Sequence, residues 1–296
     1  MKPTTIALLA LLLVALVVAI ILMRQPGEVS TSGSTGMTIA EFDSASIDRI
    51  EVRGRSESAV LEKQPDGWML VSPMRYRADG EAVTQALSKA RRTYVMSVVS
   101  TNPAKQSLFQ VDTTGTLVSF SAQGETRTAF RVGKTSPSYT ETYVRRENST
   151  DVLLADGVLI SFYSKTPGDW RDRTIFSTPE ETVTSVQLRF GDTTFTLSRS
   201  DSAWTLDGQP AQPAMVRSFL SSLAHFQADS FVDTAVSPMP PQTCTISVQE
   251  TQISFFRNAG ATQYYVAASR GPQLFSVSSW KADQLLKRKR EFLGQK

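Results

Sequence analysis

The sequence predicts an α+β protein with an N-terminal transmembrane helix followed by two repeated units of antiparallel strands. Each unit combines a hairpin and a meander with one inserted amphipathic helix. Three observations carry this prediction. The chain begins with a long apolar run, strand patterns recur at an offset of 136 residues, and a helical pattern recurs between the strands of each copy.

The N-terminal apolar run comprises residues 6–23, which are 18 consecutive apolar residues. At a rise of about 1.5 Å per residue, such a helix is about 27 Å long and crosses the hydrocarbon core of a bilayer. We expect residues 1–24 to be an uncleaved signal anchor, with a removed signal peptide as the alternative. A short N-terminal tail before a large domain favours the inner (cytoplasmic) membrane, with the bulk of the chain extracytoplasmic or periplasmic.

Residues 25–37 are rich in Gly, Ser and Thr and lack apolar periodicity. This composition is typical of a flexible tether. The remaining chain divides into a first unit at residues 38–176 and a second unit at residues 177–296.

The two units share a hairpin pattern. Residues 50–53 (IEVR) match residues 186–189 (VQLR), and residues 61–68 (LEKQPDGW) match residues 197–204 (LSRSDSAW). In each copy a polar turn joins two alternating segments, as in a β-hairpin. Trp68 and Trp204 open the second strand of each hairpin, and their equivalence favours core packing over stacking on a carbohydrate.

An amphipathic helix follows a proline-containing loop in both units, with apolar residues at i, i+3 and i+4. The residues that share this spacing are Ala82, Val83, Ala86, Leu87 and Ala90 in the first copy, and Met215, Val216, Phe219, Leu220 and Leu223 in the second. Further strands are expected at residues 94–99, 117–120, 129–132, 143–145 and 152–154, and at 226–232, 245–248, 253–257, 264–267 and 274–277. Short helices are expected at residues 157–164 and 280–289.

The composition excludes several kinds of site. The chain has one histidine and one cysteine, Cys244, so it can form neither a His/Cys zinc site nor an internal disulfide. The position of Cys244 also excludes a lipoprotein. A formal net charge of +3 over 296 residues does not indicate a nucleic-acid binder. We expect no metal and no cofactor.

No catalytic constellation is recognisable, and we expect the protein not to be an enzyme. His225 lies at the end of the second amphipathic helix, where a boundary position explains it. Ser278 and Lys281 fit the S-x-x-K spacing of serine acylases, but the supporting motifs are missing and Ser278 suits a helix N-cap. Two carboxylate pairs, Glu180 with Glu181 and Asp229 with Asp233, are interpreted as solvated surface charge.

Two charged segments are candidates for partner or lipid contact. The run Lys287, Arg288, Lys289 and Arg290 is either the solvated end of a basic terminal helix or a patch for anionic headgroups or an acidic partner. The second segment combines Trp170 with Arg171 and Arg173, and either joins the two units or offers a partner contact.

Several motifs in order resemble one family. These are the W-x-L strand at residues 68–70, FRVG at 130–133, TYV at 142–144 and DWRDR at 169–173. Together they resemble the bacterial "domain of unknown function 4340" family over nearly the whole chain, although residues 108–111 (LFQV) replace its usual Tyr-Gly-Leu-like segment. The resemblance implies a membrane-tethered extracytoplasmic protein associated with ABC-type transport of the gliding-motility kind, and it supplies no catalytic residues.

The expected function is that of a non-enzymatic, membrane-anchored accessory or scaffold protein, a subunit or partner of an ABC-type complex. The alternative is a cell-envelope glycan- or peptide-binding protein or enzyme, with a cleft between the two units. No nucleic-acid partner is expected.

Overall fold

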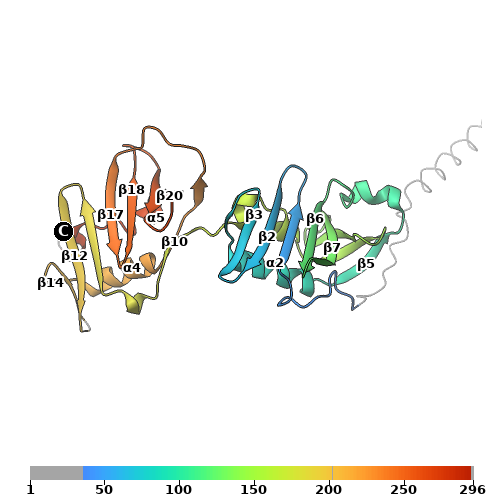
Figure 1. The fold of residues 1–296 in the computed structure, drawn as a ribbon, viewed down its shortest axis with the longest axis horizontal. Helices are drawn as coiled ribbons and strands as arrows, with labels where there is room; N and C mark the ends of the chain where they lie inside the picture. Colours follow the sequence, from blue (N-terminus) through green and yellow to red (C-terminus); the bar gives the residue numbers. More distant parts are fainter. Residues whose placement is uncertain (1–35, 202, 295–296) are drawn as a thin grey trace, which may run out of the picture. The chain divides into compact units, whose positions relative to one another are not determined.

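The computed structural model describes residues 36–201 and 203–294. It divides into two compact units, Met1–Arg171 and Asp172–Lys296, with the boundary five residues before the one expected from the sequence (Figure 1). The predicted signal anchor at residues 6–23 and most of the predicted tether lie outside the described residues. Within the described ranges, no helix combines the length and the apolar character needed to cross a membrane.

The first unit is built around one nine-stranded antiparallel sheet. Its strands are β1 (Arg49–Arg53), β2 (Ser58–Gln64), β3 (Gly67–Ser72), β4 (Tyr76–Arg77), β5 (Val95–Ser100), β6 (Thr116–Ala122), β7 (Glu125–Thr135), β8 (Glu141–Arg146) and β9 (Val152–Asp156). Their order across the sheet is β4-β3-β2-β1-β6-β7-β8-β9-β5.

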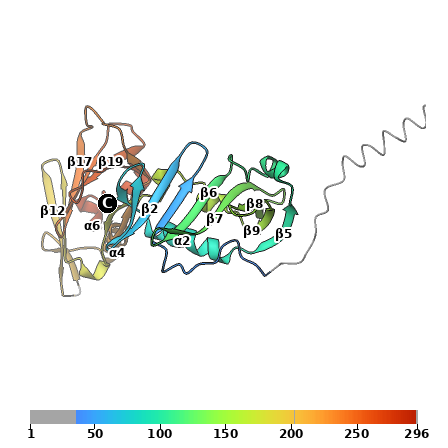
Figure 2. The same cartoon turned by 45° about the vertical axis from the view of Figure 1, so that its right-hand side comes forward.

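The path of the chain explains this order. Successive hairpins carry the chain from β1 to one edge at β4, and helix α2 (Gly80–Arg92) then leads to β5 at the opposite edge. Strand β6 pairs with β1, and the meander from β6 to β9 fills the space up to β5. The long crossover is therefore a helix along one face of the sheet, where its apolar side is buried (Figure 2).

The second unit repeats this plan. Its nine strands are β11 (Ser185–Phe190), β12 (Thr193–Ser200), β13 (Ala203–Leu206), β14 (Gln209–Pro210), β16 (Ser230–Val232), β17 (Gln242–Val248), β18 (Thr251–Phe256), β19 (Gln263–Ala268) and β20 (Leu274–Ser278). Their order, β14-β13-β12-β11-β17-β18-β19-β20-β16, places each strand where the first sheet has its counterpart. Helix α4 (Pro213–Ala224) takes the position of α2 in the chain path.

The register of the hairpins is also shared. Ile50 opposes Leu61 between β1 and β2, and Val186 opposes Leu197 between β11 and β12. This is the same pair displaced by 136 residues, as the sequence pattern predicts. The two large antiparallel sheets confirm the α+β class for the described chain.

Helices α2 and α4 begin in different ways. The Asp79 carboxylate accepts hydrogen bonds from the backbone nitrogens of Glu81 and Ala82, which satisfies donors that the first turn leaves open. Helix α4 has no side-chain cap and begins with Pro213, whose fixed φ suits the first helical position. The buried residues of α2 are the five predicted from spacing, Ala82, Val83, Ala86, Leu87 and Ala90.

Two predicted elements are divided in the structure. The strand expected at residues 226–232 becomes β15 (His225–Gln227), which pairs with β10 (Thr174–Ser177) outside the main sheet, and β16 at the sheet edge. The helix expected at residues 280–289 becomes two single turns, α5 (Ser279–Ala282) and α6 (Lys289–Phe292). Leu285 and Phe292 are both fully buried, so the chain follows the core instead of continuing as one solvated helix.

Each unit has its own hydrophobic core, and the two clusters share no residue. In the first, the Tyr163 ring packs edge-on against Phe130, and its hydroxyl donates to the Ala86 carbonyl at 2.7 Å. In the second, Phe292 packs edge-on against Phe219. The remaining short helices are η1 (Pro103–Phe109), α3 (Ile160–Tyr163), η2 (Pro167–Trp170) and η3 (Glu180–Thr182).

Candidate functional site

Two of the four basic residues at 287–290 contact other side chains of the second unit. Lys289 Nζ lies 2.6 Å from the Asp207 carboxylate, and the hydrogen bond lowers the pKa of that carboxyl. The Arg288 guanidinium lies 3.9 Å from the centre of the Phe190 ring. Lys287 and Arg290 form no ion pair with a residue of the described chain, so these two charges remain available to an acidic partner or a lipid surface.

Trp170 and Arg171 lie in the interior of the first unit. Trp170 is fully buried and Arg171 is 2% exposed. The Trp170 carbonyl accepts a hydrogen bond from the Asp79 nitrogen, and the Arg171 guanidinium stacks 4.4 Å from the centre of the Tyr76 ring. This burial leaves no surface of Trp170 for the partner contact considered above. Arg173 is half-buried at the start of the second unit.

The residues considered for catalysis have structural neighbours. Lys281 Nζ lies 2.5 Å from the Asp229 carboxylate, which also accepts a hydrogen bond from the Ser278 nitrogen at 2.7 Å. Burial raises the pKa of Asp229, but the hydrogen bonds from Lys281 and Ser278 outweigh it and leave the pKa below its ordinary value. Lys281 Nζ also donates to the Gln227 carbonyl at 3.2 Å. His225 is exposed and ends α4.

A groove in the second unit brings together residues that the sequence analysis treated separately. It has a cavity volume of about 770 Å³. We call it the second-unit groove. Its apolar lining consists of Ala203, Trp204, Pro210, Ala211, Pro213, Val216 and Leu220. Its charged rim consists of Glu180, Glu181, Arg199 and Arg217.

Residues of η3, β12, β13, β14 and α4 line this groove. Trp204 comes from β13, is half-buried and packs against the second core. The Ala211 nitrogen donates to the Trp204 carbonyl at 2.9 Å, which holds the chain beside the tryptophan before α4 begins. An Arg199 Nη donates to the Glu181 carbonyl at 2.8 Å and fixes the acidic rim against β12. Glu180 and Glu181, expected as solvated surface charge, are therefore part of a built groove.

The first unit has a groove at the corresponding place, with a volume of about 450 Å³. Trp68 lines it as Trp204 lines the other, again half-buried. Lys63 Nζ donates to the Ala45 carbonyl at 3.3 Å, the counterpart of the bond from Arg199 to Glu181 displaced by 136 residues. This first-unit groove is lined by Ser44, Ala45, Trp68, Thr84, Leu87, Ser88, Arg91 and Arg92.

The charges of the two grooves differ. Ser44 and Ala45 stand where the second unit has Glu180 and Glu181. The first-unit groove carries the cationic pair Arg91 and Arg92 and no acidic residue in its lining. The charged side chains of the first-unit groove are therefore basic alone, whereas the second-unit groove has two acidic and two basic side chains.

The repeated tryptophans were the sequence signal for these grooves. Core packing was the favoured prediction for both, and each does pack on a core, but neither is fully buried. The sequence pattern led us to expect a cleft only between the units and did not connect Glu180 and Glu181 with Trp204. Their shared offset from Ser44, Ala45 and Trp68 is the signal that could have connected them.

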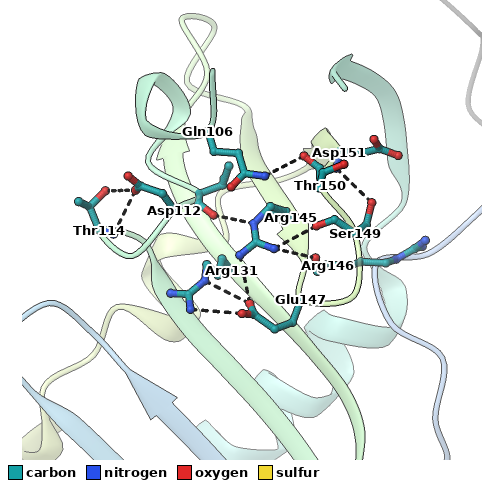
Figure 3. A network of polar contacts seen from close by, with 11 residues as sticks. Gln106, Asp112, Thr114, Arg131, Arg145, Arg146, Glu147, Ser149, Thr150 and Asp151 are labelled. Carbon is teal, nitrogen blue, oxygen red and sulfur yellow. Dashed lines mark hydrogen bonds and ion pairs between the residues drawn. The ribbon is translucent and has the colours of Figure 1, made fainter. Parts of the chain in front are cut away.

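A polar network anchors a loop of the first unit (Figure 3). Arg145 Nε donates to the Val111 carbonyl at 2.9 Å, and an Nη of the same side chain donates to the Ser149 carbonyl at 3.0 Å. The Glu147 carboxylate accepts one hydrogen bond from an Nη of Arg145 and one from an Nη of Arg131, each at 3.3 Å. The network ties the segment after η1 to the turn between β8 and β9. Because these contacts join segments that are far apart in the sequence, the network is a structural clamp.

Metal ligands and the cysteine thiol are the next candidates for chemistry among the described residues. No group of three or more His, Cys, Asp or Glu side chains is placed to hold a metal ion in the part of the chain that the structure describes. Cys244 is buried in β17, and burial raises the pKa of its thiol to about 12. Such a thiol stays protonated at neutral pH and is a poor nucleophile.

The comparisons with known proteins identify the family. The family model described as "Domain of unknown function (DUF4340)" matches residues 68–246, which is more than half of the chain and includes parts of both units. No curated protein and no solved structure matches the chain. The order of motifs had predicted this family, and the chain belongs to it.

Proposed function

We propose that the protein is a membrane-anchored extracytoplasmic accessory protein that binds partners and performs no catalysis. In this proposal residues 1–24 anchor the chain in the inner membrane and residues 25–37 form the tether. The second unit is then a diverged copy of the first, with the limits 38–176 and 177–296. Anchoring raises the effective concentration of the two units near membrane complexes. The family resemblance favours an ABC-type transport complex as the partner.

The observation that carries the proposal is the pair of equivalent grooves on one repeated plan. Each combines a half-buried tryptophan with charged residues that belong to no recognisable catalytic set. Two grooves of different charge on one chain suit a protein that holds two different partners. The 18-residue apolar run supports the membrane location.

Affinity capture tests the partner. The tagged full chain is purified from membranes in mild detergent, and the recovered proteins are compared with those on an unrelated single-span protein carrying the same tag. We expect subunits of an ABC-type transporter to be enriched. Repeated capture without any transporter subunit would contradict the assignment of an ABC-type transporter as the partner.

Membrane location is tested separately. After alkaline extraction of membranes, the full chain should stay in the pellet, and a variant lacking residues 2–24 should be released. Protease added to spheroplasts should degrade the two units if they are extracytoplasmic. Protection from the protease in intact spheroplasts would contradict that location.

A second candidate is a cell-envelope glycan- or peptide-binding protein. The observation that favours it is the carboxylate pair Glu180 and Glu181 beside Trp204, because stacking on an aromatic ring and pairing with carboxylates are common ways to hold such ligands. Sedimentation of the full chain with isolated cell-wall sacculi tests the glycan form of this candidate. Binding that persists in the Trp204→Ala variant would rule out the groove as the glycan site.

A further inference from the structure

We propose that the second-unit groove binds a linear peptide in which an apolar side chain lies next to a lysine or arginine. This inference rests on the proposed function, since it names the kind of partner segment that the accessory protein would hold. Three features of the groove carry it: its rigid apolar floor, its unpaired acidic rim and its contrast with the first-unit groove.

The floor of the groove is rigid and mostly apolar. Its volume of about 770 Å³ lies in the range typical of ligand sites, roughly 300–1,000 Å³. Trp204, Pro210 and Pro213 are part of this apolar lining. Proline loses no side-chain rotamer freedom on binding and tryptophan loses little, so the floor is preorganised for an apolar side chain.

The acidic rim selects the charge of the ligand. The carboxylates of Glu180 and Glu181 form no ion pair with any residue in the described ranges. The Arg199 guanidinium donates to the Glu181 carbonyl and to neither carboxylate of the rim. A lysine or arginine of the ligand, placed one or two residues from the apolar anchor, would complete the rim. Arg217 is exposed on α4 and adds a positive charge to the same lining, so the cation of the ligand is expected beside the two carboxylates and away from Arg217.

The first-unit groove provides a natural comparison. It has the equivalent tryptophan, Trp68, but Ser44 and Ala45 replace the acidic pair, and Arg91 and Arg92 add positive charge. A basic peptide would meet like charges there, which costs binding free energy and suppresses the wrong site. The two grooves therefore predict that the basic peptide binds once per chain.

The test uses the full chain in detergent micelles and a phage library of random dodecapeptides. Enriched sequences are synthesised with a fluorophore, and Kd is measured by anisotropy. We expect enriched peptides to pair an apolar residue with Lys or Arg. Trp204→Ala should weaken their binding about tenfold or more, as for an anchor at the centre of an interface. Glu180→Gln with Glu181→Gln should weaken it about fivefold.

Matched controls separate the groove from the fold. Trp68→Ala should leave Kd within about twofold, because the basic peptide does not use the first-unit groove. Peptides with Glu in place of Lys or Arg should bind about tenfold more weakly than their parents. If Trp204→Ala does not fold, the proposal is tested by the double variant Glu180→Gln with Glu181→Gln, which we call the glutamine pair, and by the charge-reversed peptides. Neither of these changes the core of the protein.

Several outcomes would overturn the proposal. They are the failure of any peptide to be enriched, enrichment of acidic peptides, and binding that neither the glutamine pair nor charge reversal weakens. Failure of the peptide proposal is distinguishable from failure of the proposed accessory function. Transporter subunits captured equally by wild type and the glutamine pair, without peptide binding, would leave the accessory role standing and remove the groove from it.

Discussion

Arg145 is the residue on which the loop contacts of the first unit converge. Its side chain is 11% exposed and donates to carbonyls on two separate segments while it pairs with Glu147. Arg145→Met would leave those carbonyls without this donor and the Glu147 carboxylate with Arg131 alone. We expect the free energy of unfolding to fall by about 2–4 kcal/mol, measured by urea denaturation.

The matched control for this prediction is Arg127→Met. Arg127 pairs with Glu125 at the exposed start of β7, with side chains 42% and 73% exposed. Exposed pairs contribute little, so the change should stay below about 0.5 kcal/mol. Hydrogen exchange should also speed up at residues 103–111 in Arg145→Met alone. Equal stability of the two variants would show that the clamp does not stabilise the unit.

Asp229 makes stability depend on pH in a defined direction. Despite burial, its hydrogen bonds with Lys281 and Ser278 keep the folded pKa below the ordinary value. Its contribution is therefore fully present above the unfolded pKa, about 3.9, and is lost as pH falls through the folded pKa. Asp229→Asn should lower the free energy of unfolding at pH 7 by less than about 1 kcal/mol, because the side chain is 42% exposed.

Urea denaturation at pH 7 and near pH 2 checks this sign. The difference between wild type and Asp229→Asn should shrink at the lower pH, because protonation of the carboxyl removes the charge that Lys281 and Ser278 contact. Asp66→Asn, in the exposed turn between β2 and β3, is the control and should show no such difference. A difference of the same size at both pH values would contradict the role of the ionised carboxylate.

At the scale of elements, a single side chain caps the N-terminus of α2. The Asp79 carboxylate caps two backbone nitrogens. Asp79→Ala should lower the free energy of unfolding by about 1 kcal/mol, whereas Asp79→Asn keeps an acceptor and should cost only a few tenths. Chemical denaturation of both variants measures the difference. Equal loss in the alanine and asparagine variants would assign the effect to charge instead of capping.

The elements also show what sequence could predict and what it could not. The buried face of α2 was predicted residue by residue, because helical periodicity is a local property. The division of residues 225–232 into β15 and β16 was not, because the choice between pairing with β10 and with β20 is made by tertiary contacts. The single helix expected at residues 280–289 was wrong for the same reason: burial of Leu285 and Phe292 redirects the chain.

At the scale of the whole molecule, the shared offset predicted the repeated hairpins and helices, and both sheets have the same strand order. The grooves were not predicted, because each groove depends on how deeply the side chain of Trp204 or Trp68 is buried in its core. A sequence pattern assigns a tryptophan to one face of a strand but does not fix that depth. Once the tryptophan is half-buried, residues from the preceding turn and the following helix become its neighbours.

Two cores that share no residue predict two separable unfolding transitions. Leu61 and Leu197 are equivalent, fully buried positions in the first and second clusters. Leu61→Ala and Leu197→Ala should each lower the stability of their own unit by about 2–5 kcal/mol through lost burial and the cavity left behind.

Hydrogen exchange followed by mass spectrometry during denaturant titration of the full chain resolves the two units. In Leu61→Ala, protection should be lost early in β1, β2 and β6 while β11, β12 and β17 keep the wild-type midpoint, and Leu197→Ala should show the reverse. Each variant is the control for the other, because the substitution and the burial are matched. If either variant shifted both sets of strands together, the two units would be one cooperative body, and a ligand in the second-unit groove would stabilise the first unit as well.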